Sequence, residues 1–140
     1  MKNKKYPITL KNVTKADFQF LYELLSERDS RANISHKKMP TYDEHLKFVT
    51  SKPYSKWYII YYYNKKSGSI YLSKQNEIGI FLKKEIQGKG IGTKALELIM
   101  KKNGSKRYLA NISPKNKKSI EFFKKHGFKL VQYTYELIKT

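Results

Sequence analysis

The interpretation of this chain rests on the stretch Gln87-Gly88-Lys89-Gly90-Ile91-Gly92-Thr93. An alternating apolar segment, residues 77–82, precedes it, and an amphipathic segment, residues 91–102, follows it. A strand, a glycine-rich turn and a helix together can bind a pyrophosphate. Glycine permits positive φ, and the N–H groups of the turn and of the helix N-terminus face the anion. The stretch therefore favours an enzyme that uses a cofactor over a merely basic domain.

The glycine spacing excludes two common phosphate-binding motifs. It lacks the G-x-x-x-x-G-K-[ST] of a P-loop, and no acidic residue follows a second strand about 20 positions on, as a dinucleotide-binding fold requires. It does match the pattern [QR]-x-x-G-x-[GA]. A second motif follows a short apolar strand at residues 107–112 and reads Asn116-Lys117-Lys118-Ser119-Ile120-Glu121-Phe122-Phe123-Lys124-Lys125-His126-Gly127-Phe128.

In this order, and separated by one helix and one strand, the two motifs resemble those of the GCN5-related N-acetyltransferase (GNAT) superfamily. The resemblance covers residues 77–128, and the N-terminal half matches in outline. It implies a single GNAT domain over residues 1–140, of the α/β (α+β) class. We expect one central mixed, mostly antiparallel sheet of six or seven strands, flanked by four helices. It also implies acetyl-CoA as co-substrate, with no metal.

Local patterns place the elements in the order β-α-α-β-β-β-α-β-α-β. Thr14 with Asp17, and Thr41 with Glu44, are capping signals that open the first two helices. Gly104 is placed to end the third helix. We expect strands at 8–13, 57–63, 69–72, 77–82, 107–112 and 128–137, with a hairpin turn at 64–68.

By the resemblance, the backbone of Ile80, Phe81 and Leu82 holds the pantetheine arm, and one of these N–H groups serves as oxyanion donor. The Asn116 amide would bond the pantetheine, although an N-cap role also explains it. The whole set expected to contact the cofactor is Ile80, Phe81, Leu82, Gln87, Gly88, Lys89, Gly90, Ile91, Gly92, Thr93, Asn111, Asn116, Ser119 and Phe123.

The catalytic acid is where the chain departs from the family. Many members have a Tyr seven residues after the motif asparagine, and here that position is Phe123, which carries no proton. One possibility is that the thiolate leaves unaided, which a thiol pKa of about 8.5 permits. Otherwise another hydroxyl such as Tyr133 substitutes, or catalysis is weak. Glu77 is the predicted general base, with an exposed strand-end carboxylate as the competing interpretation.

The acceptor is expected to be a small-molecule or peptide amine that attacks the thioester directly. His36, Glu44 and His45 are predicted to bind it, since their segments line the acceptor side in this fold. The stretch from residue 42 to 48 also resembles one in amino-sugar N-acetyltransferases of nucleotide-activated nonulosonate pathways. A nucleotide-linked amino sugar and a protein N-terminus both remain open.

The amino-acid composition limits the possible functions of the chain. Thirty Lys and Arg against 11 Asp and Glu give a net charge of +19. The lysines are spread along the chain and no nucleic-acid-binding motif is present, which favours a solvated basic surface over a nucleic-acid face. Without cysteine there is no disulfide framework and no thiolate nucleophile. We expect a cytoplasmic monomer or homodimer without membrane contact. The alternative function is a catalytically weak module on the same scaffold that binds CoA, an anionic metabolite or RNA.

Overall fold

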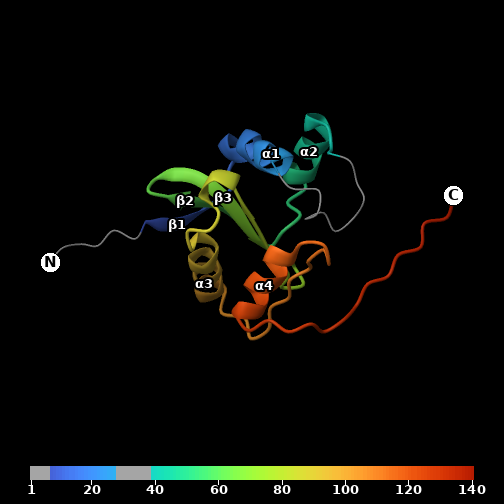
Figure 1. Ribbon diagram of the computed structural model, residues 1–140. Coiled ribbons are helices and arrows are strands. Elements are labelled where there is room, and N and C mark those ends of the chain that lie inside the picture. The colour runs from blue at the N-terminus through green and yellow to red at the C-terminus, as the bar shows by residue number, and fades with distance from the viewer. Residues whose placement is uncertain (1–6, 28–38) are drawn as a thin grey trace.

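The computed structural model describes residues 7–27 and 39–140, and it places one sheet between two layers of helices (Figure 1). The order is β1 (Ile8–Asn12), α1 (Phe18–Ser26), α2 (Tyr42–Thr50), β2 (Lys56–Tyr62), β3 (Lys65–Leu72), β4 (Ile78–Leu82), α3 (Ile91–Asn103) and α4 (Lys117–Lys125). The strands are antiparallel in the spatial order β1-β2-β3-β4. No helix in the described ranges is long and apolar enough to span a bilayer.

The sheet buries both of its faces because its central strands alternate between two cores. Ile60 and Ile70 face α3, where they pack with Leu96 and Ile99. Ile59 points the other way and packs with residues of α1 and α2. Successive side chains of a strand point to opposite faces, so a central strand with apolar residues at consecutive positions is covered on both sides.

The helix ends follow the expected local signals. The Thr41 N–H donates to Glu44 Oε1 at 2.8 Å and the Glu44 N–H donates to Thr41 Oγ1 at 3.1 Å, which forms the predicted capping box of α2. The Thr14 N–H donates to Asp17 Oδ2 at 2.8 Å, but the capping box of these two residues opens a 3-10 helix (Lys15–Asp17) directly before α1, whose own N-cap is Asp17. The third helix ends, as predicted, at Gly104, which has φ of 60°.

The hairpin between β2 and β3 turns earlier than the predicted position, 64–68. Tyr63 and Asn64 have φ of 48° and 66°, and β3 begins directly afterwards at Lys65. Positive φ at both residues suits a two-residue turn that matches the twist of the strands. Gly68, which suggested a turn, instead lies within β3, where an added Cβ would come 2.3 Å from the Phe81 carbonyl oxygen.

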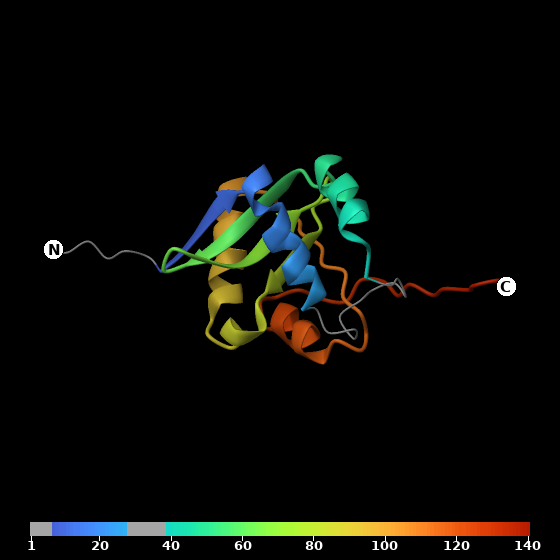
Figure 2. The same cartoon turned by 90° about the horizontal axis from the view of Figure 1, so that it is seen from above.

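The expectation of six or seven strands is wrong for the described residues, in which the sheet has four strands. The segment 107–112 joins it through one parallel bridge between Glu77 and Leu109. Residues 128–137 form no strand, because after α4 they lie beside no described segment whose backbone groups they could pair with. The C-terminal residues lead away from the domain instead (Figure 2).

Candidate active site

After β4, a 3-10 helix (Lys84–Ile86) leads into the glycine turn, which opens α3. Gly88 and Gly90 have φ of 83° and 77°, and Gly90 is the N-cap of α3. An added Cβ at either glycine would meet nothing within 4 Å, so the requirement here is one of backbone conformation. In the part of the chain that the structure describes, the N–H groups of residues 88–90 have no hydrogen-bond acceptor. Such N–H groups at a helix N-terminus fit a pyrophosphate.

Beside the turn, β4 separates from the segment 107–112. The Ile78 N–H donates to the Leu109 carbonyl at 2.8 Å, and the Leu109 N–H donates to the Asn76 carbonyl at 2.9 Å. Backbone groups alternate along a strand, so those of Ile80 and Leu82 point to the same side as those of Ile78. Within the described ranges, no segment pairs with β4 on that side beyond the bridge at Glu77. The gap therefore offers the N–H groups of Ile80 and Leu82 to a ligand, whereas Phe81 pairs with Ser69 of β3. The Leu82 carbonyl accepts from Gln87 Nε2 at 3.3 Å.

Helix α4 closes one side of the turn. An added Cβ on Gly92 would lie 3.3 Å from Phe122, so α3 and α4 meet closely there. The Thr93 hydroxyl and His126 Nε2 are 3.0 Å apart and join the start of α3 to the end of α4. These residues are 33 positions apart, and no signal in the sequence indicated the contribution of His126.

At the N-terminus of α4, the Ser119 N–H donates to Asn116 Oδ1 at 3.2 Å. Asn116 is therefore the N-cap, and its side-chain NH₂ group is left for any contact with a cofactor. Phe123 is 6% exposed. Its ring lies 5.1 Å from that of Phe122 and 5.0 Å from that of Phe128, so it belongs to the apolar packing behind α4.

Glu77 is held where the two strands part. Its Oε1 accepts from the Ser73 hydroxyl at 3.0 Å and its Oε2 accepts from Asn111 Nδ2 at 2.9 Å. Both carboxylate oxygens thus already have a donor. Tyr133 lies elsewhere, in the C-terminal segment, where it is 73% exposed. The structure brings Glu77 and Asn111 together and leaves Tyr133 apart from them.

On the acceptor side, His45 is buried between α1 and α2. Its ring centroid lies 5.2 Å from that of Tyr22 and 6.4 Å from that of Tyr42, and its Nε2 has no hydrogen-bond partner among the described residues. Burial lowers the pKa of His45, and a hydrogen bond with the Phe18 backbone only partly opposes this. Glu44 serves the helix cap, and the predicted site residue His36 lies outside the described residues.

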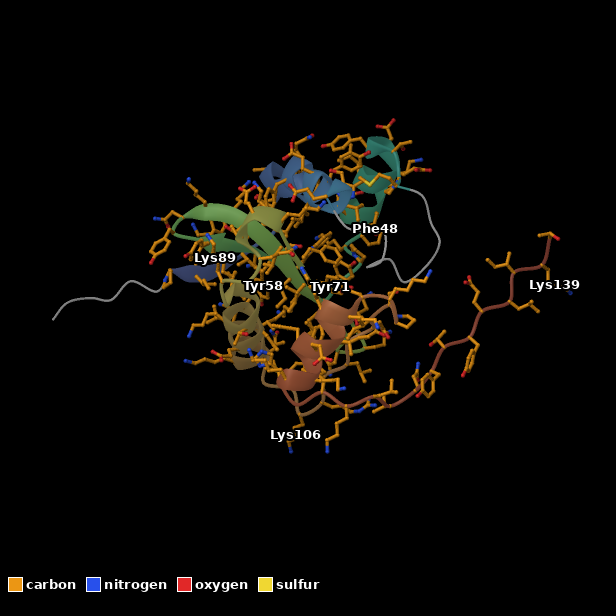
Figure 3. All side chains as sticks on the ribbon, viewed as in Figure 1. Phe48, Tyr58, Tyr71, Lys89, Lys106 and Lys139 are labelled. Atoms are coloured by element: carbon orange, nitrogen blue, oxygen red, sulfur yellow. The ribbon has the colours of Figure 1, made fainter. Side chains whose placement is uncertain are left out.

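An aromatic cluster that sequence reasoning missed lies next to β4. The rings of Tyr54 and Tyr71 stack with centroids 3.7 Å apart, and Tyr71 meets Phe81 edge to face at 6.3 Å. Figure 3 shows Tyr71 near the middle of the domain with Phe48 of α2 above it. An added Cβ at Gly79 would come 2.2 Å from the Tyr71 ring, so this glycine makes room for the aromatic ring.

Positive charge gathers beside the glycine turn. A cavity of about 390 Å³ lies between the β2–β3 hairpin and the turn, and its lining includes Lys65, Lys66, Lys83 and Lys89 against one acid, Glu85. Lys66 is paired with Asp17 at 2.7 Å. The cavity would attract an anion, as the net charge of the chain also implies.

The described residues thus place a gap between β4 and the segment 107–112 beside a turn with lysine side chains and free N–H groups. The model of the "Acetyltransferase (GNAT) family" matches residues 18–128. The chain belongs to this family, whose members transfer acetyl groups from acetyl-CoA.

Solved structures with the same fold include a domain from Methanocaldococcus jannaschii DSM 2661, 27% identical, with a TM-score of 0.80 and 92% of each chain covered. An acetyltransferase from Thermus thermophilus is 20% identical, with a TM-score of 0.74, over 91% of this chain and 90% of that one. RimL, a ribosomal L7/L12 alpha-N-protein acetyltransferase solved with coenzyme A, is 18% identical, with a TM-score of 0.73, over 91% and 83%. No curated protein matches the chain.

Proposed function

We propose that the protein transfers the acetyl group of acetyl-CoA to a primary amine by direct attack. The amine nitrogen forms a C–N bond to the thioester carbonyl carbon, the C–S bond breaks, CoA leaves as the thiolate, and the nitrogen loses a proton. The observation that carries this proposal is the turn at residues 88–90, which lies beside the gap at β4. Its N–H groups have no acceptor among the described residues.

The backbone of β4 supplies the oxyanion donor in this proposal. The N–H groups of Ile80 and Leu82 point into the gap, and a fixed donor there stabilises the negative charge that develops on the carbonyl oxygen. The turn from Gln87 to Thr93 holds the pyrophosphate, and the Asn116 amide nitrogen bonds the pantetheine while its oxygen caps α4.

Proton transfer needs a base, and Glu77 is our candidate. It sits at the base of the gap, and the donors Ser73 and Asn111 fix the orientation of its carboxylate. A carboxylate in a fixed orientation can accept the proton of the amine directly or through one water molecule. Phe123 cannot supply the acid, and Tyr133 is exposed in the C-terminal segment. The leaving thiolate therefore departs unaided, unless Tyr133 is brought to the site.

For the acceptor, we propose a nucleotide-linked amino sugar or a protein N-terminus. The first is supported by the cationic cavity and by the resemblance of the segment at residues 42–48, and the second by the likeness to RimL. A screen of both acceptor classes, with free thiol measured as CoA is released, separates them.

The proposal is tested by calorimetric titration of acetyl-CoA at moderate salt, with desulfo-CoA and ATP as reference ligands. Gly90→Asp places a carboxylate in the turn and should weaken acetyl-CoA binding at least about tenfold, which corresponds to about 1.4 kcal/mol. Gly104→Asp is the matched control, because Gly104 also has positive φ and open space but ends α3 at its far end. Equal losses in the two variants, or ATP binding as tight as acetyl-CoA, would refute the site.

A second candidate function is a CoA- or RNA-binding module with weak catalysis. Two observations favour it: the buried Phe123 cannot supply an acid, and the net charge is +19. RNA binding would weaken steeply with salt and would survive Gly90→Asp. Acetyl transfer to an amine with a kcat of about 1 s⁻¹ or more, in the ordinary range of enzymes, would exclude this weakly catalytic alternative.

A further inference from the structure

The C-terminal residues 129–140 carry the side-chain pattern of a half-buried strand. Val131, Tyr133, Tyr135 and Leu137 fall on one face by the period of two, and Gln132, Thr134 and Glu136 fall on the other. Yet the apolar residues of the segment are 64% to 89% exposed. A β-rich apolar face of this length favours burial against another surface.

The described domain also has an open sheet edge. The segment 107–112 meets β4 through Leu109, and Tyr108 and Ala110 make no backbone hydrogen bond with any residue in 7–27 or 39–140. Backbone groups along such an edge can pair with another strand, and an unprotected edge invites pairing with a second chain.

The segment does not fill this edge in its own molecule. The Phe128 N–H donates to the Phe123 carbonyl at 3.0 Å, and Gly127, with φ of 92°, sets the direction in which the chain leaves α4. Figures 1 and 2 both show the residues beyond α4 running away from the sheet, and Figure 3 places Lys139 far from the domain. Within one described chain, the apolar face of the segment and the open edge therefore do not meet.

We propose that two copies of this chain exchange their C-terminal segments, so that residues 130–138 of each copy pair with residues 107–112 of the other. Each chain contributes one open edge and one segment with the pattern of a strand, so a twofold exchange satisfies both at once. The proposal is independent of the acetyl-transfer chemistry.

The charge of the chain predicts how this dimer responds to salt. Two copies of +19 repel each other, so added salt should strengthen the association by screening. Association bridged by RNA would respond in the opposite way, because salt weakens binding to phosphates.

The test is the mass of the full chain in solution, by light scattering during gel filtration, at low and moderate salt. We expect twice the 16.6 kDa of one chain at moderate salt. The double variant Tyr135→Asp/Leu137→Asp charges the apolar face and should give the mass of one chain. The variant Gln132→Asp/Thr134→Asp adds charge of the same sign to the polar face and should remain a dimer. All four positions are exposed in the single chain, so neither variant should impair its folding, and acetyl-CoA binding or circular dichroism checks this.

Hydrogen exchange then identifies the edge. In the dimer, the amides of Tyr108 and Ala110 and of the segment 131–137 should be protected, and the double variant with the charged apolar face should lose that protection. A single-chain mass for the unmodified protein at every salt concentration would overturn the proposal. So would a dimer that survives the charged apolar face, or one in which the amides of residues 108 and 110 exchange freely.

Discussion

Replacing Gly79 by alanine tests how tightly the sheet is packed where β4 approaches the gap. The new methyl carbon would lie 2.2 to 2.5 Å from three atoms of the Tyr71 side chain, the ring carbons Cζ and Cε2 and the hydroxyl oxygen Oη. The ring can move away only by leaving its stack with Tyr54, where the centroids are 3.7 Å apart. Overpacking costs about 1–3 kcal/mol and loss of an aromatic pair about 0.5–1.5 kcal/mol, so we expect a loss of about 2–4 kcal/mol.

Urea unfolding followed by the fluorescence of Trp57, the single tryptophan, measures this loss. With a slope of about 2 kcal/mol per molar urea, the midpoint should fall by about 1–2 M. The ring of Trp57 lies 4.7 Å from that of Tyr54, so the native signal should change as well.

A double variant separates the steric clash from a general weakening of the sheet. Tyr71→Ser removes the ring that the methyl group meets, so in that background Gly79→Ala should cost almost nothing. If the two substitutions instead add to within about 0.5 kcal/mol, the residues are not coupled and the steric account is wrong.

Three further predictions concern ionisable groups. Burial raises the pKa of Asp17. The hydrogen bond and charge of Lys66, together with the Thr14 N–H, lower it by more, so the net pKa lies below the ordinary value of 3.8. The ionised pair therefore stabilises the fold above about pH 4, and this contribution is lost as pH falls through the folded-state pKa. Asp17→Asn should cost about 2 kcal/mol at pH 7 and flatten the acid limb of the unfolding midpoint. For His45, burial lowers the pKa below 6.5, so folding favours the neutral form. The free energy of unfolding should therefore decline as pH falls below about 6.5. His45→Gln should remove that decline, and a variant with the same pH profile as the unmodified protein would contradict this account. Glu77→Gln should reduce kcat at least about 100-fold with little change in Tm if the carboxylate is the base, whereas a lower Tm with normal kcat would assign it to holding Ser73 and Asn111.

The features that were predicted correctly depend on residues close together in sequence. Thr41 and Glu44 are three positions apart, and their capping box forms as expected. The left-handed Gly104 ends α3 at the expected place. In these cases the atoms that fix the conformation all belong to one turn of chain, so local chemistry determines the outcome.

The features that were missed depend on distant partners or on competing local preferences. The pattern of residues 128–137 is that of a strand, but a strand forms only when another segment lies beside it. Gly68 suggested a turn, yet close approach to Phe81 explains it, and the turn falls on Tyr63, a residue type that rarely adopts positive φ. The contact between Thr93 and His126 joins two helices and has no local signature.

The hydrogen bonds of Glu77 fix the vertex at which β4 and the segment 107–112 diverge. Because the gap between β4 and the segment 107–112 is held closed at Glu77, its width can change only by rotation of β4 about that end. A small rotation of β4 near residue 77 would then produce a larger displacement at Leu82 and at the glycine turn, because these lie farther from the axis of rotation. Substitution of Ser73 would then alter the width of the gap at Leu82 without changing any residue that is expected to contact the cofactor.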